Sequence, residues 1–317
     1  MKMKNKFIFN SNSAFTTFSS HERGFTLIEL LVTIALLGIL AGGILIALNI
    51  GGVLGKANIT KAKKFAASLE RGLVISQVGK WSFEDGSGDT AKDTSGYGNN
   101  GDLAGSATTC PGGAACPTWK TATDCTLGFG GCLSFEGNDY VSFGNKEVLK
   151  PTDSVTITAW FKYGASSGYI FSNWWVSGWK GINLGVRTIG TSTTLKFTIG
   201  PGVNPSSGNN HADAGGLYND GQWHHVVGVF DKPNNKIKIF IDGKLMQSKD
   251  TDITGLISYE DDLGEYVSIG ATNVSTGATR FWNGLIDEVA IYNEPLTLSQ
   301  IRSLYASGVI RRAIAYR

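Results

Sequence analysis

The sequence predicts an α+β fold in which a long, hydrophobic N-terminal α-helix is followed by an antiparallel β-sandwich. Two observations support this prediction. Residues 25–50 are almost continuously apolar, whereas the part from residue 79 onward is rich in Gly, Thr, Ser, Asn, Trp and Tyr, the residues of strands and turns. With 317 residues, the chain is long enough for one large domain and a further segment.

Charge is distributed unevenly along the chain. Four basic residues and one acidic residue give residues 1–24 a charge of +3, so the remainder carries −1 of the net +2. Domains that bind nucleic acid usually display a strongly basic surface. The sequence therefore gives no electrostatic reason to expect a nucleic-acid partner.

The N-terminal segment places its polar residues before its apolar ones. Residues 1–24 are polar and basic and end at Gly24, and the apolar run begins at Phe25 with Glu29 as its only charge. An ordinary secretory signal has its apolar core before the cleavage site, so this segment does not fit one. Residues 30–48 are uncharged and long enough, at 1.5 Å per residue, to cross about 30 Å of hydrocarbon. The segment therefore predicts a transmembrane helix.

This arrangement closely resembles the N-terminus of type IV prepilins and pseudopilins. The resemblance implies cleavage between Gly24 and Phe25 by a prepilin peptidase, N-methylation of Phe25, and assembly with identical or related pilin subunits by an inner-membrane machinery. A carboxylate at membrane depth costs about 2.5–3.5 kcal/mol, so Glu29 needs a partner, and the resemblance supplies the free amine of Phe25 on a neighbouring subunit. A plain membrane anchor is the alternative.

The apolar run continues into an amphipathic segment. Apolar side chains recur at three- and four-residue steps after residue 58, which favours one continuous helix. The expected segments are a leader at 1–24, the helix at 25–78, a sandwich head at 79–308 and a C-terminal tail at 309–317.

The head is predicted to consist of short strands. In 153–163 and 236–245, apolar residues alternate with polar or aromatic ones, the period of a half-buried strand, and Asp242-Gly243 is a strong hairpin signal. Many strands without alternating helices favour a sandwich. Further strands are expected at 133–135, 140–143, 169–172, 195–199, 225–231, 266–269 and 285–292.

The head resembles the laminin-G-like, concanavalin A-like jelly rolls. The similar segments are LSFEGNDYVSFG, ITAWFK, DGQWHHVVGVFD, KIKIFIDGKL, YVSIGA and FWNGLIDEVAIYNEPLTLSQIRSLY, in this order. The resemblance covers residues 81–305 and implies an antiparallel jelly-roll β-sandwich. Thr297 and Gln300 fit a capping box that opens a short helix, with Gly308 expected just beyond its end.

All four cysteines lie close together in a segment rich in Gly, Thr and Pro. Their spacing does not match the CxxC pairs of zinc ribbons, and no histidine is nearby, so metal ligation is the weaker alternative to disulfides. Two disulfides imply an oxidising compartment, and the sequence leaves their pairing open. The residues are Cys110, Cys116, Cys125 and Cys132.

Asp287 is the most informative carboxylate of the head. In a strict two-residue alternation it shares a face with Val289 and Ile291, where a buried charge needs a donor or a cation. Residues 93–101 resemble the Asn- and Gly-rich turn of laminin-G-like domains that often holds structural calcium, an ion that takes six to eight oxygen ligands. The alternative is that Asp287 accepts hydrogen bonds from that turn. The implied calcium site comprises Asp93, the backbone at Gly98 and Asn99, and Asp287.

Trp174, Trp175 and Trp179 lie in a loop-like region beside amide and lysine side chains. Exposed aromatic rings suit the apolar faces of sugars, so these residues form a candidate glycan-binding platform, with packing or a subunit contact as the alternative. The acids at 260, 262 and 265 match the spacing of jelly-roll glucanases poorly, because an acidic residue and a glycine lie between them. No catalytic residue is therefore expected.

Together these features predict a non-enzymatic type IV pilin-like subunit, major or minor, that polymerises through its N-terminal helix. The precursor is expected in the inner membrane, and the assembled protein in an extracellular filament or a periplasm-spanning pseudopilus. No cofactor is required, and a structural calcium ion is the candidate ligand of the head. An adhesin that binds glycans or surfaces through the jelly roll is the alternative, and a tethered glycosidase is a remote one.

Overall fold

The computed structural model describes much of the second part of the chain. The described residues are 73–105, 110, 116–125, 130–164, 167–174, 178–189, 192–202, 210–216, 218–259, 266–272 and 277–315. The chain divides into two units, 1–57 and 58–317, and every described residue belongs to the second. The predicted leader and the predicted helix up to residue 72, including Gly24, Phe25 and Glu29, lie outside the described residues. Among the helices that are described, none is both long and apolar enough to span a membrane.

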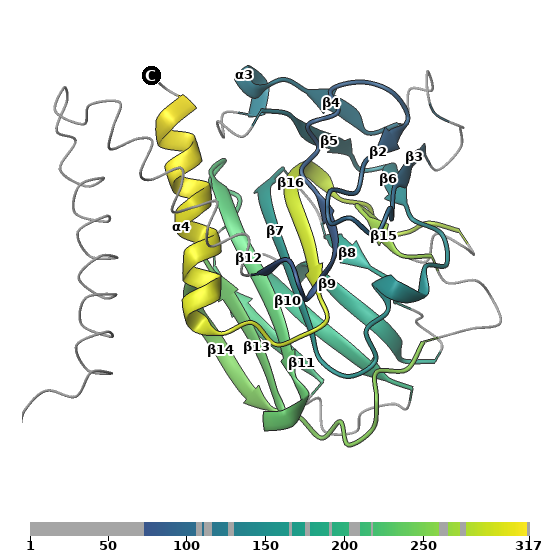
Figure 1. Ribbon diagram of the computed structural model, residues 1–317, viewed down its shortest axis with the longest axis vertical. Coiled ribbons are helices and arrows are strands. Elements are labelled where there is room, and N and C mark those ends of the chain that lie inside the picture. The colour runs from purple at the N-terminus through teal and green to yellow at the C-terminus, as the bar shows by residue number, and fades with distance from the viewer. Residues whose placement is uncertain are drawn as a thin grey trace, which may run out of the picture. The chain divides into compact units, whose positions relative to one another are not determined.

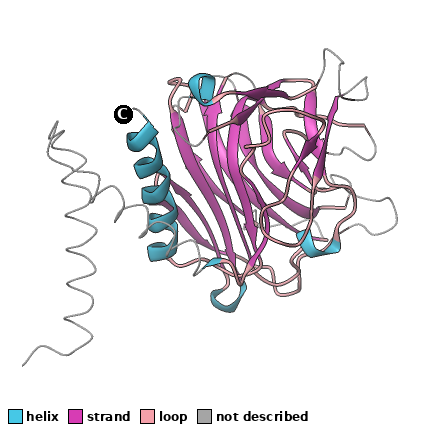
Figure 2. Cartoon of the chain, turned by 45° about the horizontal axis from the view of Figure 1, so that its top comes forward, coloured by secondary structure: helices cyan, strands magenta, loops and turns pink. Residues whose placement is uncertain are grey.

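Two antiparallel sheets of eight strands each pack face to face as a β-sandwich (Figures 1 and 2), as predicted. The strand order of the first, sheet A, is β14-β13-β12-β7-β16-β5-β4, with β1 paired to β16. Sheet A contains β1 (Gln77–Trp81), β4 (Thr118–Lys120), β5 (Cys132–Glu136), β7 (Val155–Tyr163), β12 (Trp223–Asp231), β13 (Lys236–Ile241), β14 (Lys244–Asp250) and β16 (Asn283–Tyr292).

The order of sheet B is β11-β10-β9-β8-β15-β6-β3-β2. It contains β2 (Thr90–Ala91), β3 (Gly101–Gly105), β6 (Asp139–Ser142), β8 (Gly168–Ser172), β9 (Lys180–Ile189), β10 (Ser192–Pro201), β11 (His211–Gly215) and β15 (Ser268–Ile269). The described helical elements are α3 (Ala122–Cys125), α4 (Leu298–Ala315) and the 3-10 turns η1 (Glu147–Leu149) and η2 (Lys232–Asn234).

The core lies between the sheets and follows the predicted alternation. Every second residue of β7, from Val155 to Phe161, and of β13, from Ile237 to Ile241, is buried in one apolar cluster. The hairpin between β13 and β14 turns at Asp242 and Gly243, whose φ angles of 50° and 73° are those of a type I′ turn. The hairpin signal in the sequence is confirmed.

The boundary between the predicted helix and head is wrong by a few residues. Residues 77 and 78, assigned to the helix, belong to β1, which pairs with β16. Leu73 already packs against the outer face of sheet A, together with Val227 and Tyr292. The head therefore begins before residue 79, because pairing with β16 overrides the local helical pattern.

Helix α4 covers part of the outer face of sheet A (Figure 1). The predicted capping box is present, since the Gln300 backbone N–H donates to Thr297 Oγ1 at 3.3 Å and the Thr297 N–H donates to Gln300 Oε1 at 2.8 Å. The helix does not end at Gly308, however, and continues to Ala315, so most of the expected tail is helical. A Cβ at Gly308 would lie 2.5 Å from the indole of Trp160. The glycine allows close packing of helix on sheet instead of ending the helix.

The cysteines form the two predicted disulfides, each between neighbours in sequence. Cys110 bonds to Cys116, and Cys125 bonds to Cys132. The second pair is fully buried beside Trp160 and Trp223. It ties α3 to the first residue of β5.

Asp287 does not lie on the predicted face of β16. The pairing of β16 with β7 shifts between Asp287 and Ala290, and Glu288 has a φ of 47°, which identifies a β-bulge. Ile286, Val289 and Ile291 consequently face the core, whereas Asp287 lies opposite Trp160 on the other side. The prediction that Asp287 shares a face with its apolar neighbours was wrong, because a bulge reverses the alternation.

Candidate functional site

The outer face of sheet B carries an open hollow of about 410 Å³. Along β9 and β10, residues 182, 184, 186, 195, 197 and 199 face the core, so the residues between them face outward. The hollow lies over these outward-facing positions and the ends of neighbouring loops. It is lined by Tyr169, Trp174, Trp179, Asn183, Gly185, Val186, Arg187, Lys196, Thr198, Asn210, His211, Thr272 and Arg280.

Two tryptophans form an aromatic wall of this hollow. The rings of Trp174 and Trp179 meet edge to face with centroids 6.2 Å apart. Trp174 is 8% exposed and Trp179 is 40% exposed, so the buried ring supports the exposed one. Trp179 has a φ of 51°, a left-handed conformation that is rare for a bulky residue and is often found at functional sites. Its carbonyl accepts a hydrogen bond from the Gly202 N–H at 3.0 Å.

Gly185 is the one glycine among the described residues that line the hollow. Gly185 pairs with Tyr169 on one side and with Lys196 on the other. A Cβ at Gly185 would lie 2.4 Å from the Gly168 carbonyl oxygen and 2.7 Å from the Tyr169 ring. The glycine therefore allows the Tyr169 ring and the Gly168 backbone to pack closely over the strand at this position.

The hollow is positively charged. Arg187 and Arg280 are exposed, and neither forms an ion pair with a residue in the described part of the chain. Burial raises the pKa of the Tyr169 hydroxyl, and Arg280 and Arg187 act in the opposite direction. Burial also lowers the pKa of Lys196, whose ammonium lies 3.8 Å from Asp213.

Asp213 and His211 form the polar rim on β11. The His211 Nε2 lies 3.3 Å from Asp213 Oδ2. Although burial acts to raise it, the pKa of Asp213 is lowered by His211, by Lys196 and by Lys249. This carboxylate is therefore ionised and already balanced by cations of its own.

The predicted calcium residues have separate hydrogen-bond partners. The Asp93 carboxylate accepts from the backbone N–H groups of Lys80, Ser95 and Asn99 at 2.8–3.0 Å and from the Ser95 hydroxyl. The Asn99 side chain donates to the Val78 carbonyl, so it secures the turn. No described hydrogen bond joins this turn to Asp287, and no cluster of three or more His, Cys, Asp or Glu in the described residues could hold a metal ion. Asp93 thus acts as a turn-stabilising acceptor, and calcium stays a prediction.

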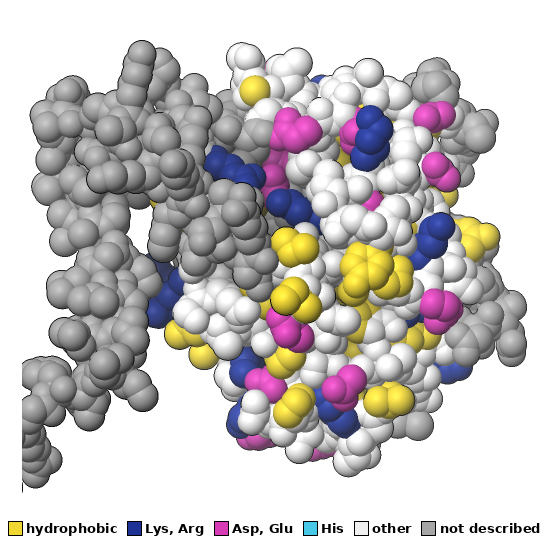
Figure 3. All heavy atoms as spheres, in the orientation of Figure 1, with side chains coloured by type: hydrophobic (Ala, Val, Ile, Leu, Met, Phe, Trp, Pro, Cys, Tyr) yellow, Lys and Arg dark blue, Asp and Glu magenta, His cyan; other side chains and the backbone are white. Residues whose placement is uncertain are grey.

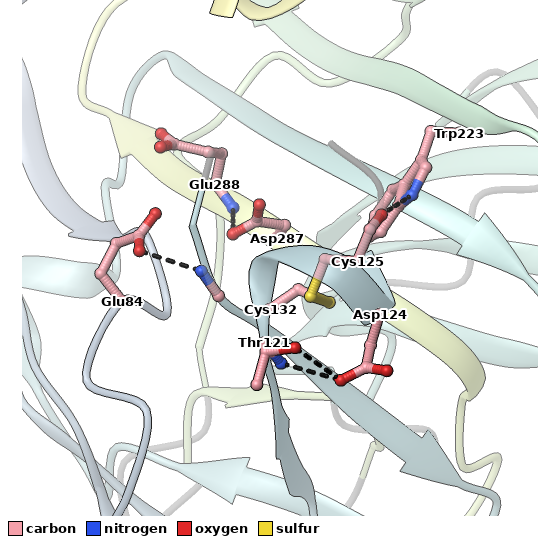
Figure 4. The surroundings of a disulfide bond; sticks show 9 residues. Glu84, Thr121, Asp124, Cys125, Cys132, Trp223, Asp287 and Glu288 are labelled. Atoms are coloured by element: carbon pink, nitrogen blue, oxygen red, sulfur yellow. Dashed lines mark hydrogen bonds between the residues drawn. A yellow bond between two sulfur atoms is a disulfide. The ribbon is translucent and has the colours of Figure 1, made fainter. Parts of the chain in front are cut away.

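Asp287 lies in a carboxylate-rich environment beside the Cys125–Cys132 disulfide (Figure 4). Its side chain is fully buried, Oδ1 accepts from the Glu288 N–H at 2.8 Å, and Oδ2 has no partner among the described residues. Burial raises its pKa well above the usual value, and the negative charges of Glu288 and Glu84 add to this effect. A protonated Asp287 fits this environment better than a carboxylate does.

Charges on the surface drawn in Figure 3 are mixed. Lysine, arginine, aspartate and glutamate side chains alternate over that face without an extended region of one sign.

Sequence reasoning found only part of the hollow. Trp174 and Trp179 both line the hollow, but only Trp179 is exposed as the predicted platform requires, and glycan binding stays a prediction. Trp175 and the acids at 260, 262 and 265 lie outside the described residues. The prediction missed Tyr169, Arg187, Lys196, His211 and Arg280. The alternation of 182–187 would have placed Arg187 outward, but three glycines in 181–190 hid the strand.

Comparisons with known proteins agree with this fold. The model of the concanavalin A-like lectin/glucanases superfamily matches residues 135–302, and that of the prokaryotic N-terminal methylation motif matches residues 19–45. No curated protein matches the chain significantly.

Solved structures with this fold have low sequence identity. Domain 4 of AbnA, a GH43 extracellular arabinanase from Geobacillus stearothermophilus in complex with arabinotriose, is 17% identical over 72% of this chain and 97% of that chain, with a TM-score of 0.49. The binding domain of Paraclostridial Mosquitocidal Protein 1 is 14% identical over 74% of this chain and 52% of that chain, with a TM-score of 0.50. The chain thus spans about half the length of that binding domain. At such identities the likeness shows the fold alone. On the family match, which covers more than half of its residues, the chain belongs to the concanavalin A-like lectin/glucanases superfamily, and its N-terminus carries a prokaryotic methylation motif.

Proposed function

We propose that the chain is a type IV pilin-like subunit whose β-sandwich head binds carbohydrate in the hollow on sheet B. The N-terminal segment anchors the precursor in the membrane and assembles the filament, and the head is displayed outside the cell. The proposal is one of binding and includes no catalytic step.

The observation that supports carbohydrate binding most directly is the conformation of Trp179. The backbone of Trp179 is held in a left-handed conformation, and its exposed indole is supported by the indole of Trp174. The exposed ring suits the apolar face of a sugar, and the amide and hydroxyl groups that line the hollow suit its hydroxyls. Because Trp179 remains 40% exposed, part of its ring is accessible to a ligand.

The methylation motif supports the filament part of the proposal. It covers Gly24, Phe25 and Glu29, the residues proposed for cleavage, N-methylation and subunit contact. The proposed partners are identical or related pilin subunits, a prepilin peptidase and an inner-membrane assembly machinery. Whether the subunit is major or minor does not alter the roles of these residues.

A glycan array tests the binding part. The full-length chain in non-ionic detergent is expected to bind a defined set of glycans, and Trp179→Ala is expected to weaken this binding by about tenfold or more. Tyr97→Ala is a matched control, because Tyr97 is an exposed aromatic residue remote in sequence from the hollow, 54% exposed. A chain that binds no glycan, or a Trp179→Ala variant that binds as the wild type does, contradicts the proposal.

N-terminal sequencing and fibre imaging test the assembly part. The mature protein is expected to begin at Phe25, and Glu29→Ala is expected to abolish filaments because the buried amine loses its partner. Glu22→Ala removes the same charge from the leader and should leave filaments intact. Filaments that form normally from the Glu29→Ala variant would refute the assembly mechanism.

A further inference from the structure

We infer that the hollow on sheet B selects a negatively charged saccharide, one that carries carboxylate or sulfate groups. This inference rests on the proposed carbohydrate-binding function and adds the charge of the ligand. It follows from two arginines that line the hollow and have no anionic partner among the described residues.

Three described cations converge on the hollow from different elements. Arg187 comes from β9, Lys196 from β10, and Arg280 from the segment before β16. Both arginines are exposed and have no ion-pair partner among the described side chains. Their guanidinium donors are thus available to a ligand, and the planar fork of arginine matches a carboxylate or sulfate group.

The cations are close enough to influence the same groups. Arg280 and Arg187 both act on the Tyr169 hydroxyl, and Arg187 joins burial in lowering the pKa of Lys196. Like charges in a partly buried hollow repel one another, so an anion bound between them relieves this repulsion. A neutral sugar would leave the repulsion in place.

The nearby carboxylate does not neutralise the arginines. Asp213 lies 3.8 Å from Lys196 and 3.3 Å from His211, so its charge is shared by these two neighbours. No carboxylate is among the described residues that line the hollow. The described lining therefore keeps the two arginine charges uncompensated.

The shape of the hollow separates a ring site from an anion site. Trp174 and Trp179 provide the aromatic wall, and the cationic side chains of Arg187 and Arg280 also line the hollow. A saccharide fits this division, because a sugar ring has an apolar face and an acidic substituent has a localised charge. A bare anion would use the arginines without the tryptophans.

Calorimetric titration of the full-length chain in non-ionic detergent tests the inference with four polymers. Dextran is the neutral saccharide, dextran sulfate and alginate are the sulfated and carboxylated ones, and polyphosphate is an anion without sugar. At least one acidic saccharide is expected to bind about tenfold or more tighter than dextran, and its identity distinguishes sulfate from carboxylate. Arg187→Gln and Arg280→Gln are each expected to weaken that binding by about tenfold or more, the usual effect of losing a charge-assisted hydrogen bond.

Matched variants give the outcomes that overturn the inference. Lys244→Gln makes the same charge change at an exposed residue of β14 and should leave binding unchanged. One outcome would show that the inference is wrong while the proposed function stands. In that outcome neutral glycans bind, Trp179→Ala abolishes their binding, and the arginine variants have no effect. If polyphosphate binds as tightly as the acidic saccharides and Trp179→Ala changes nothing, simple charge attraction refutes both. Binding to none of the polymers and no glycan on the array also refutes both.

Discussion

The stability of the head is expected to depend on pH through the ionisation of the Asp139 carboxyl. This side chain is fully buried at the start of β6, and one oxygen accepts from the Glu136 N–H at 3.0 Å. The other oxygen, Oδ2, has no partner among the described residues. Burial raises the pKa of Asp139 from 3.8 to about 6, although the Glu136 N–H opposes this effect.

The size of the effect follows from the two pKa values. A pKa of about 6 in the folded protein and 3.8 in the unfolded chain correspond to about 3 kcal/mol, at 1.36 kcal/mol for each tenfold change in proton affinity. Between these pH values the folded protein keeps the proton and the unfolded chain has lost it. The contribution to stability is therefore fully present below about pH 4 and is lost as the pH rises through about 6.

Asp139→Asn removes the titration and keeps the acceptor oxygen for Glu136. Relative to the wild type, the variant is expected to gain about 3 kcal/mol of stability between pH 3.5 and pH 7.5, or about 6–12 °C in Tm for a domain of this size. Thermal unfolding of the full-length chain, followed by tryptophan fluorescence, measures this, because all eight tryptophans lie between residues 81 and 282. Asp102→Asn is the control, since Asp102 is an exposed aspartate on β3. A stability difference between variant and wild type that does not change with pH would refute the reasoning.

Three further changes test the packing of the head by the same assay. Replacing Cys125 and Cys132 by serine is expected to lower the free energy of unfolding by about 2.5 kcal/mol from loop entropy, and further because the site is buried. The loss should therefore exceed that from replacing the partly exposed Cys110 and Cys116, and equal losses would contradict this. Gly308→Ala is expected to destabilise the head by about 1–3 kcal/mol, because the added Cβ would meet the buried indole of Trp160. This outweighs the better helix propensity of alanine, and a gain in Tm would instead show that the helix can shift. Asp242 holds the pKa of His224 above its usual value. His224→Gln should therefore lower the free energy of unfolding by on the order of 1 kcal/mol at pH 5 and by less at pH 8, and a decrease independent of pH would rule out the ion pair.

Several features of the fold could be predicted because neighbouring residues determine them. The alternation in β7 and β13, the turn at Asp242 and the capping box at Thr297 each depend on residues only a few positions apart. Such patterns directly reflect the periods of strands and the geometry of turns. The disulfides could also be predicted, but not their pairing, which depends on where the chain folds back.

Other features depend on contacts between distant segments. The bulge at Glu288 arises where β16 pairs with β7. Gly308 lies within α4 because its missing side chain lets the helix pack against Trp160, a residue far earlier in the chain. Strand β9 was missed because its glycines, among them Gly185, are poor strand formers taken alone, and pairing on both sides stabilises it.

The sequence by itself determined that an apolar, motif-bearing N-terminus precedes a two-layered β-sandwich, since both follow from local composition and period. Only the tertiary structure decided that Trp179, Arg187 and Arg280 surround one hollow on the outer face of sheet B. These residues come from separate strands and loops, and only the pairing of β8, β9 and β10 brings them together. The strand order thus decides which charged and aromatic side chains meet at the candidate site, and no local sequence pattern specifies the strand order.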